Sequence, residues 1–138
     1  MVDDRGFATL EDIIAILAED TEYPLEGTLL HATLDHGLVS PSIFKDRGNH
    51  ILYRDPDLDV LGDALLDFWE GQEGDPRWTD MELVIRDGRF DLRYVCADAI
   101  DLEESSIDRR TRIVRSYFGD KPIIYPPSPE DDLPTYAL

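Results

Sequence analysis

Apolar residues recur at the spacing of an α-helix in two segments of the first half of the chain, and each pattern predicts an amphipathic helix. The first helix is expected over residues 9–20, because Thr9 followed by Asp12 resembles a capping box. The second is expected from Asp55-Pro56, an acidic N-cap followed by proline, to about Glu70. The apolar positions are Leu10, Ile13, Ile14 and Leu17 in the first helix and Leu58, Leu61, Leu65 and Phe68 in the second.

Three segments between these helices predict short strands, over 28–34, 38–44 and 50–54. The first of them alternates apolar and polar residues, and Asp35-His36-Gly37 is expected to form the turn that follows it. Pro41 lies inside the second segment. Because proline cannot donate a hydrogen bond to a sheet ladder, it predicts an edge position or a bulge at that point.

A β-hairpin is predicted most clearly by the pair Asp87-Gly88, which favours a two-residue type I′ turn between strands 78–86 and 89–95. Such a turn fixes the register of the two strands. One face then pairs Ile85 with Phe90, Leu83 with Leu92 and Met81 with Tyr94, so that face is apolar. The other face pairs Glu82 with Arg93 and Val84 with Asp91, and it is mostly charged.

A last helix is expected over 107–118, with Ser105 or Ser106 as its cap and Gly119 as its stop. From residue 120 onward we expect no regular structure, because five prolines fall within 13 residues. They are Pro122, Pro126, Pro127, Pro129 and Pro134.

The predicted order of elements is therefore α-β-β-β-α-β-β-α, which is typical of an α+β fold. We expect an antiparallel sheet of about five strands with helices packed on one face, followed by a Pro-rich C-terminal tail. The expected domain organisation is a single domain over 1–125 and an extended tail over 126–138.

The charge of the chain narrows the class of partner. Its 138 residues include 31 acidic and 13 basic side chains, for a net charge of −18, and residues 1–75 hold 18 of the acids but 4 of the bases. This argues against binding to nucleic acid or an anionic membrane, and it favours a basic protein. A single cysteine, a start without the features of a secretory signal, and the lack of a long apolar run predict a cytoplasmic protein.

Carboxylates recur every four residues along the second predicted helix, at Asp55, Asp59, Asp63 and Asp67, with Glu70 near the same side. Like charges at this spacing destabilise a helix by ~0.2–0.5 kcal/mol per pair. The helix dipole compensates in the first turn alone. Two interpretations are open: a solvated face of an acidic protein, or a row of carboxylates spaced to meet lysines and arginines of a partner. These five residues are the candidate partner-binding site.

Motifs for catalysis or for a cofactor are missing from the sequence. His31, His36 and His50 lack the spacing of metal ligands and are expected at turns and strand ends near the surface. Cys96 lies in no nucleophile motif and is expected in the core at a strand end, and no phosphate-binding loop occurs. We therefore expect no metal, no cofactor and no enzyme activity. The alternative, a carboxylate-dependent metal hydrolase, would need three or more converging carboxylates or histidines.

Four arginines lie in the last predicted helix: Arg109, Arg110, Arg112 and Arg115. On so acidic a protein we expect them to pair with nearby acids rather than to bind nucleic acid. Those acids are Asp101, Glu103, Glu104 and Asp108. Trp69 and Trp78 flank a loop and are expected in the core, with anchoring of a partner as the alternative.

Several motifs in residues 76–125 occur together. They are Pro76-Arg77-Trp78-Thr79 before a strand, Asp87-Gly88-Arg89-Phe90 at the hairpin turn, and a last helix with Arg109-Arg110 followed by Tyr117-Phe118-Gly119-Asp120-Lys121-Pro122. In this combination, and in the order of the upstream elements, the chain resembles the YezG-like family of bacterial immunity proteins.

The resemblance implies a non-catalytic protein that binds and neutralises a cognate toxin domain, often a nuclease, made by the same cell. The charge leads independently to a similar expectation, because a nuclease must be basic to hold its substrate and an acidic inhibitor would associate with it quickly. We therefore expect an immunity protein that binds a basic toxin domain through its acidic surface. An interaction module for another basic protein is the alternative.

Overall fold

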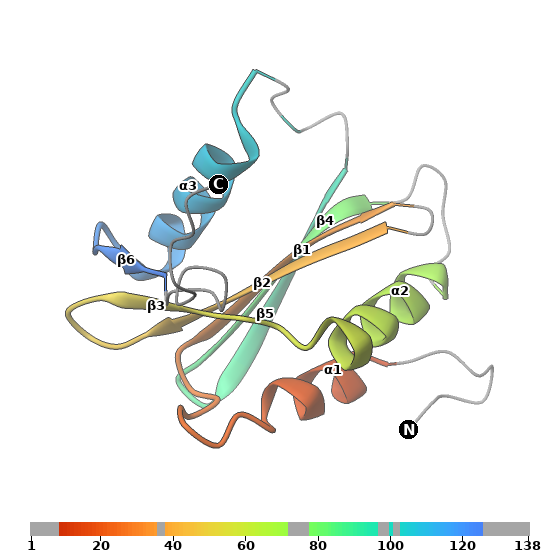
Figure 1. Ribbon diagram of the computed structural model, residues 1–138, viewed down its shortest axis with the longest axis horizontal. Coiled ribbons are helices and arrows are strands. Elements are labelled where there is room, and N and C mark those ends of the chain that lie inside the picture. Colours follow the sequence, from red (N-terminus) through yellow and green to blue (C-terminus); the bar gives the residue numbers. More distant parts are fainter. Residues whose placement is uncertain (1–8, 36–37, 72–77, 97–99, 101–102, 126–138) are drawn as a thin grey trace, which may run out of the picture.

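One six-stranded sheet organises the molecule (Figure 1). The computed structural model describes residues 9–35, 38–71, 78–96, 100 and 103–125. Across the sheet the strand order is β5-β4-β1-β2-β3-β6, and every neighbouring pair is antiparallel except β3 with β6. The strands are β1 (Thr28–Asp35), β2 (Leu38–Asp46), β3 (Ile51–Arg54), β4 (Trp78–Arg86), β5 (Arg89–Cys96) and β6 (Ile123–Ile124). The predicted α+β class is confirmed.

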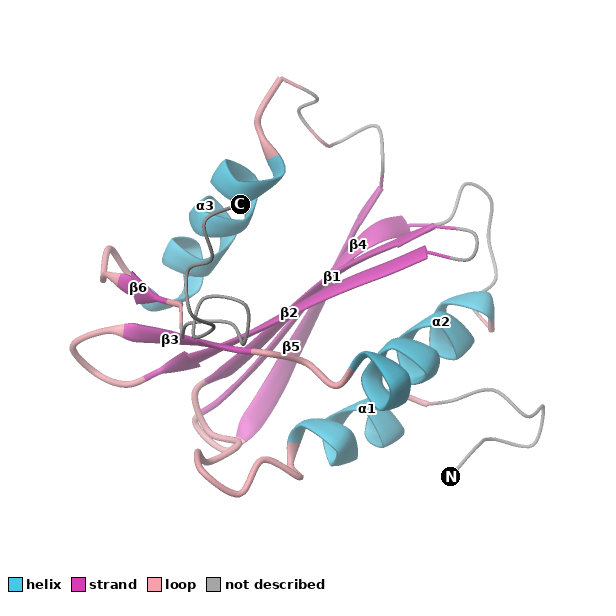
Figure 2. Cartoon of the chain, in the orientation of Figure 1, coloured by secondary structure: helices cyan, strands magenta, loops and turns pink. Residues whose placement is uncertain are grey.

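Helices cover both faces of this sheet, so the expectation that they would cover one face is wrong (Figure 2). On one face lie α1 (Leu10–Leu17), the single wide π-type turn η1 (Leu58–Gly62) and α2 (Asp63–Glu70). On the other face lies α3 (Ser106–Phe118). Because both faces are covered, alternate residues of β1 can be apolar on either side, and Leu29 and Leu30 are both fully buried.

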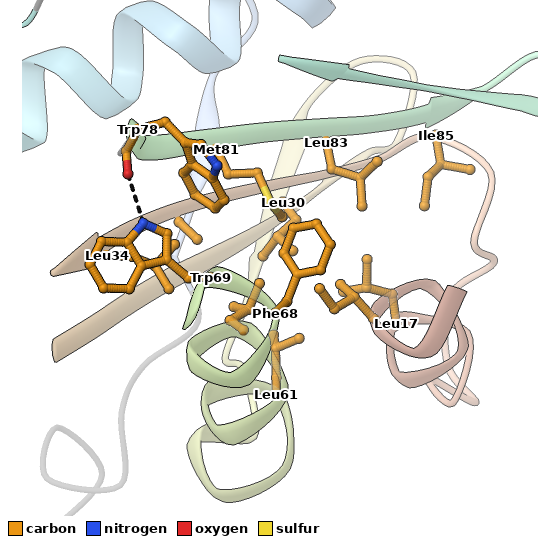
Figure 3. Packing of buried hydrophobic residues seen from close by; sticks show 13 residues of the cluster. Leu17, Leu30, Leu34, Leu61, Phe68, Trp69, Trp78, Met81, Leu83 and Ile85 are labelled. Atoms are coloured by element: carbon orange, nitrogen blue, oxygen red, sulfur yellow. Dashed lines mark hydrogen bonds between the residues drawn. The ribbon is translucent and has the colours of Figure 1, made fainter. Parts of the chain in front are cut away.

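The larger core lies between the sheet and the α1/α2 layer (Figure 3). The predicted core aromatics are confirmed: Trp69 and Trp78 are buried, and the indole N–H of Trp69 donates to the carbonyl oxygen of Trp78 at 2.7 Å. Trp78 also stacks on Tyr94 of β5, with 4.5 Å between ring centroids. The two indoles thus join α2 to β4 and β5 within this core.

The β4–β5 hairpin has the register that the Asp87-Gly88 turn predicts, down to Arg86 opposite Arg89. Asp87 has a positive φ of 58°, as a type I′ turn requires. The charged side of β4 is not solvent-exposed, because α3 covers it, and Glu82 is 4% exposed.

The segment after α3 contains a strand, so the expectation of no regular structure from residue 120 onward is wrong there. Ile123–Ile124 form β6, which pairs in parallel with β3, so the sheet has six strands where about five were expected. Pro122 precedes this strand and uses its carbonyl to accept a hydrogen bond from Ile51 N–H. The expected tail over 126–138 lies outside the described residues.

Pro41 lies neither in an edge strand nor at a bulge, so the expectation for it is wrong. β2 is interior to the sheet, but β3 pairs with Ile43–Asp46 alone. At Pro41 the neighbour of β2 among the described strands is therefore β1, and the ladder between these two strands has no bulge. The missing N–H costs little at a position with one open side.

Capping side chains set the helix ends much as expected. α1 begins with the predicted capping box, in which Thr9 Oγ1 accepts from Asp12 N–H and Asp12 accepts from Thr9 N–H. Ser105, one of the two expected residues, caps α3, and Gly119 ends it with a φ of 89°. Along the described parts of the chain, no helix combines the length and the apolar character needed to span a bilayer.

Candidate functional site

The candidate acidic row begins differently from the prediction, because the helix start is Asp57 and not Asp55. Asp57 Oδ1 accepts hydrogen bonds from the N–H groups of Asp59 and Val60, at 3.1 and 3.3 Å. The first turn is the wide η1 turn, and it continues directly into α2. Asp55 therefore precedes the helix, and the four aspartates do not form one row of an α-helix.

The wide turn also changes which apolar side chains face the core. The sequence spacing predicts that Leu58 and Leu61 share the buried face, but Leu58 is 59% exposed while Leu61 is 1% exposed. A π-type turn holds more residues than an α-turn, so the register before it is rotated relative to the register after it. The expectation for Leu58 is wrong, whereas Leu61, Leu65 and Phe68 are buried as expected.

The carboxylates of the candidate site lie at the surface of the α1/α2 layer. Asp55, Asp59, Asp63 and Glu70 are exposed, and Asp67 is half-buried. In the described part of the chain, no ion pair joins the four exposed carboxylates to a basic side chain. They are not buried, and no arginine of the described residues holds them.

Basic residues are excluded from the whole helical part of this layer. The three segments α1, η1 and α2 contain six acids and no lysine or arginine, with sequences LEDIIAIL, LDVLG and DALLDFWE. α3 on the opposite face contains four arginines and one acid, in SIDRRTRIVRSYF. The two helical layers therefore have opposite charge.

A cavity of about 240 Å³ lies where the C-terminal end of α1 meets the start of η1. Its apolar walls come from Ile16, Leu17, Ile43, Val60 and Leu61, and its polar groups are Glu19, Asp20, Lys45, Arg54, Asp55 and Asp57. We call this the α1–η1 cavity. It adjoins the candidate site, since Asp55 belongs to both.

Two of its polar groups, Lys45 and Arg54, are held by neighbouring groups of the same chain. Arg54 donates to both oxygens of Asp20 at 3.1 Å, and the buried Lys45 Nζ donates to Thr28 Oγ1 and to the Pro24 carbonyl. Burial lowers the pKa of Lys45, an effect that the nearby Asp20 partly offsets. Partial burial would raise the pKa of Asp20, but hydrogen bonds from Glu22 N–H and Arg54 outweigh it and hold the pKa below its usual value.

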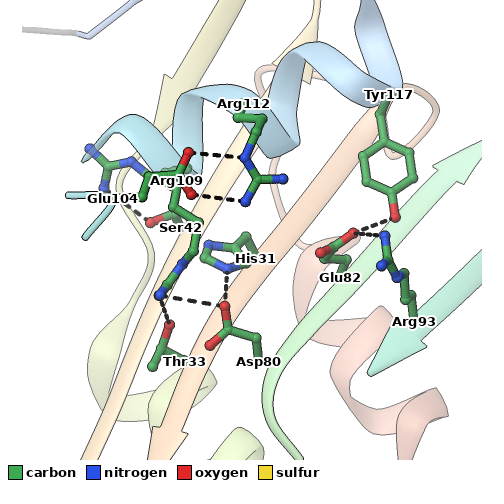
Figure 4. Close-up of polar contacts among 11 residues, drawn as sticks. His31, Thr33, Ser42, Asp80, Glu82, Arg93, Glu104, Arg109, Arg112 and Tyr117 are labelled. Carbon is green, nitrogen blue, oxygen red and sulfur yellow. Dashed lines mark hydrogen bonds and ion pairs between the residues drawn. The ribbon is translucent and has the colours of Figure 1, made fainter. Parts of the chain in front are cut away.

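A second polar cluster lies under α3 (Figure 4). His31 Nε2 is 3.0 Å from Asp80 Oδ2, and the same oxygen is 3.5 Å from a guanidinium nitrogen of Arg109. Burial would raise the pKa of Asp80, but His31 and Arg109 lower it below its usual value. His31 is 5% exposed, so the expectation of a surface histidine is wrong for it. His50 is half-buried beside Asn49, and His36 lies outside the described residues.

The neighbouring carboxylate of β4 is held in a similar way. Glu82 accepts a 2.6 Å hydrogen bond from the hydroxyl of Tyr117, and Arg93 lies 3.9 Å from the same oxygen. Sequence reasoning missed both Asp80 and Glu82 as buried groups. One signal was available: alternate acids in a strand that also carries buried apolar residues indicate a polar face that needs partners.

The arginines of α3 pair with acids of the chain, but not mainly with the acids expected. Arg112 binds Glu104 with two hydrogen bonds, as predicted, while Arg109 reaches Asp80 and Arg115 pairs with Asp120. Arg110 donates to Ser42 and lies over the rings of Tyr53 and Tyr125. Asp101 lies outside the described residues.

The described residues bring together no group of side chains suited to holding a metal ion. No three histidine, cysteine, aspartate or glutamate side chains there come together as metal ligands would. Cys96 lies at a strand end as expected but is exposed, so its predicted core position is wrong. Cys96 is the last residue of β5, which is an edge strand of the sheet.

Comparison with known proteins adds no relative to this description. No protein-family model matches the chain, and no curated protein matches it. The resemblance to the YezG-like immunity proteins therefore stays a prediction from the motifs.

Proposed function

We propose that this protein is a cytoplasmic binding protein of the immunity type, which occludes a basic toxin domain through the acidic surface of its α1/α2 layer. The observation that carries the proposal is the set of exposed carboxylates on η1 and α2, in a helical layer without a lysine or arginine. Like-charged side chains at helical spacing cost stability, so an external cation is the partner that would relieve that cost.

Charge segregation supports the same proposal. The arginines of α3 are directed to Asp80, Ser42 and Glu104 on or near their own face, so they do not neutralise the acidic layer on the far side of the sheet. An unneutralised acidic surface raises the rate at which a basic protein arrives. A fast arrival suits an inhibitor whose target harms the cell that makes it.

The test has two stages. Cross-linking in the cells that make the protein, followed by mass spectrometry, identifies the partner, and stopped-flow mixing then measures its association rate. In the stripe variant, Asp59→Asn, Asp63→Asn and Glu70→Gln are combined. We expect it to associate about tenfold more slowly at low salt, with a smaller deficit at high salt.

A matched control separates the site from net charge. Asp87→Asn, Asp91→Asn and Asp108→Asn remove three exposed charges from the hairpin and α3, so the net charge changes by the same amount. Equal slowing in the stripe and control variants, or an acidic partner, would overturn the proposal. A basic partner that is harmless to cells when made alone would favour the interaction module over the immunity protein.

A further inference from the structure

We propose that the α1–η1 cavity is the specificity pocket of the acidic surface, and that it receives one arginine side chain of the basic partner. This inference rests on the proposed function and names the chemical group that the acidic surface would recognise. The cavity volume of about 240 Å³ is below the ~300–1,000 Å³ of ordinary small-molecule sites, so it suits a single side chain.

The charge of the cavity selects a cation. Four carboxylates line it, against two cations that already have partners within the chain. Arg54 binds Asp20 through two hydrogen bonds and also lies 3.6 Å from Glu22, and Lys45 donates to two oxygens. Glu19 and Asp55 are exposed and have no ion pair within the described residues, which leaves their carboxylates available to a guest.

The C-terminal end of α1 adds to the negative electrostatic potential of the cavity. Its last turn contains no basic residue, and its C-terminal carbonyls carry partial negative charge toward the side of the cavity formed by Ile16 and Leu17. A lysine or arginine near this end of a helix can complement it. Here the complementary cation is missing from α1 itself, and an incoming guanidinium would supply it.

The walls of the cavity fit the rest of an arginine. The aliphatic stem of an arginine packs on apolar surface while its planar head binds carboxylates through paired hydrogen bonds. Val60, which lines the cavity, is 46% exposed, and Leu58 on the same wide turn is 59% exposed. Val60 is thus available to exclude water from the charged pair, as the contacts around an arginine hot spot do.

The wide turn explains how the sequence produces this arrangement. An α-helical first turn would direct Leu58 to the core beside Leu61 and remove one of the exposed apolar side chains. Asp57 caps the start of this π-type turn, where its Oδ1 accepts hydrogen bonds from Asp59 N–H and Val60 N–H. π-type turns are often found at functional sites, where they redirect side chains.

The probe for this inference is Nα-acetyl-arginine methylamide, titrated into the full-length protein and followed by the backbone amide NMR signals of Leu17, Val60 and Leu61. We expect saturable millimolar binding that shifts these three signals. Nα-acetyl-citrulline methylamide, which has the same shape without the charge, should bind more weakly. The corresponding lysine derivative should also bind more weakly, because an ammonium lacks the planar fork.

Two double variants and the stripe variant make the test specific. Asp55→Asn with Glu19→Gln should lower the affinity for the arginine probe by about two- to fivefold. The control double variant, Asp91→Asn with Asp108→Asn, removes the same charge far from the cavity and should leave the affinity unchanged. The stripe variant should also bind the probe normally, since none of its three substituted residues lines the cavity.

Different experimental results would overturn the arginine pocket and the proposed function. Equal binding of the citrulline probe, shifts confined to other residues, or equal effects of both double variants would overturn the arginine pocket. If the stripe variant still slowed association with a basic partner, the acidic surface would stand without this pocket. Loss of charge dependence in the association experiment would overturn the proposed function itself, and the pocket with it.

Discussion

Helices pack on both faces of the sheet, but the charged side chains lie in different places on the two faces. On the α1/α2 face the contact layer is apolar, with Leu30, Leu34, Met81 and Leu83 meeting the helices, and the carboxylates lie outside. On the α3 face a smaller apolar cluster is joined by buried charges that bind one another. The α3 face neutralises its charges internally. The α1/α2 face does so at Asp20, Lys45 and Arg54, but it leaves the exposed carboxylates of its helices for solvent or a partner.

This difference indicates which face can change during evolution or on binding. Removing one member of a buried charged cluster leaves another charge without its partner, which is costly. Removing an exposed carboxylate leaves nothing unpaired. The α3 face is therefore restricted in sequence, whereas the acidic face is free to adapt to a partner.

The largest effect should follow from breaking the charge cluster under α3. Asp80→Ala leaves His31 and Arg109 beside each other without the carboxylate, and we expect the free energy of unfolding to fall by about 3–5 kcal/mol. Asp91→Ala on the adjacent strand, whose side chain is exposed, should change it by about 0.5 kcal/mol or less. Urea unfolding measures both. Similar values for the two variants would mean that the α3 face does not depend on its internal pairing.

The contribution of Asp80 to the free energy of unfolding depends on pH with a defined sign. The pKa of Asp80 is lower in the folded protein than its usual value, so its stabilising contribution is present above that value and is lost as the pH falls toward the folded pKa. In acid titrations followed by circular dichroism, Asp80→Asn should therefore lose less stability than the wild-type protein below about pH 4. Equal losses would assign the acid sensitivity to other carboxylates.

The second effect tests the apolar face and the wide turn together. Leu61 is 1% exposed and Leu58 is 59% exposed. Leu61→Ala should lower the free energy of unfolding by about 2–5 kcal/mol, because it opens a cavity in the core. Leu58→Ala should change it by about 0.5 kcal/mol or less. Equal costs would show that the segment begins as an ordinary α-helix, as the sequence spacing predicted.

The contrast between these two leucines shows where sequence reasoning succeeds and where it stops. The hairpin register was predictable because two residues, Asp87-Gly88, determine the turn, and the turn determines the pairs from Arg86–Arg89 to Asp80–Val95, beyond which the register shifts. The exposed position of Leu58 could not be predicted, because an α-turn and a π-type turn use the same residue types and differ by about one residue per turn. The strand β6 was missed for a related reason, since its two residues gain their pairing from β3 and not from a local pattern.

The candidate site could also be predicted only in part from the sequence. Its charges follow from the sequence alone, and their exposure on one layer is confirmed for Asp59, Asp63 and Glu70. The cluster of His31, Asp80 and Arg109 was not predictable, because its first two members are 49 residues apart and meet through the pairing of β1 with β4. Contacts set by sheet order require the topology, which periodicity does not supply.

A smaller effect concerns the hydrogen bond between Tyr117 and Glu82 on the α3 face. Tyr117→Phe removes a hydrogen bond to a carboxylate that is 4% exposed, and we expect the free energy of unfolding to fall by about 1.5–3 kcal/mol. Burial, together with Glu82, raises the pKa of Tyr117 well above its usual value. The folded state therefore keeps the proton while the unfolded state loses it, and stability decreases as the pH rises above about 10.

The variant isolates this contribution from the other tyrosines. Tyr53 and Tyr94 also have raised pKa values, mainly through burial, and they titrate in both proteins. The gap in stability between wild type and Tyr117→Phe should therefore narrow as the pH increases through the alkaline range. A constant gap would indicate that Glu82 finds another donor when Tyr117 is absent.

The smallest expected changes in the free energy of unfolding should have opposite signs on the two faces. Asp63 has a like charge four residues further along α2, at Asp67, so Asp63→Asn should raise the free energy of unfolding by roughly 0.2–0.5 kcal/mol. Asp108 lies in the first turn of α3, where a carboxylate complements the helix dipole, and Asp108→Asn should lower the free energy of unfolding by about 0.3–1 kcal/mol. Both changes should shrink in high salt. A loss of stability in Asp63→Asn would show that the acidic face is stabilised by its carboxylates, and the case for a cationic partner would then lose the energetic observation on which it depends.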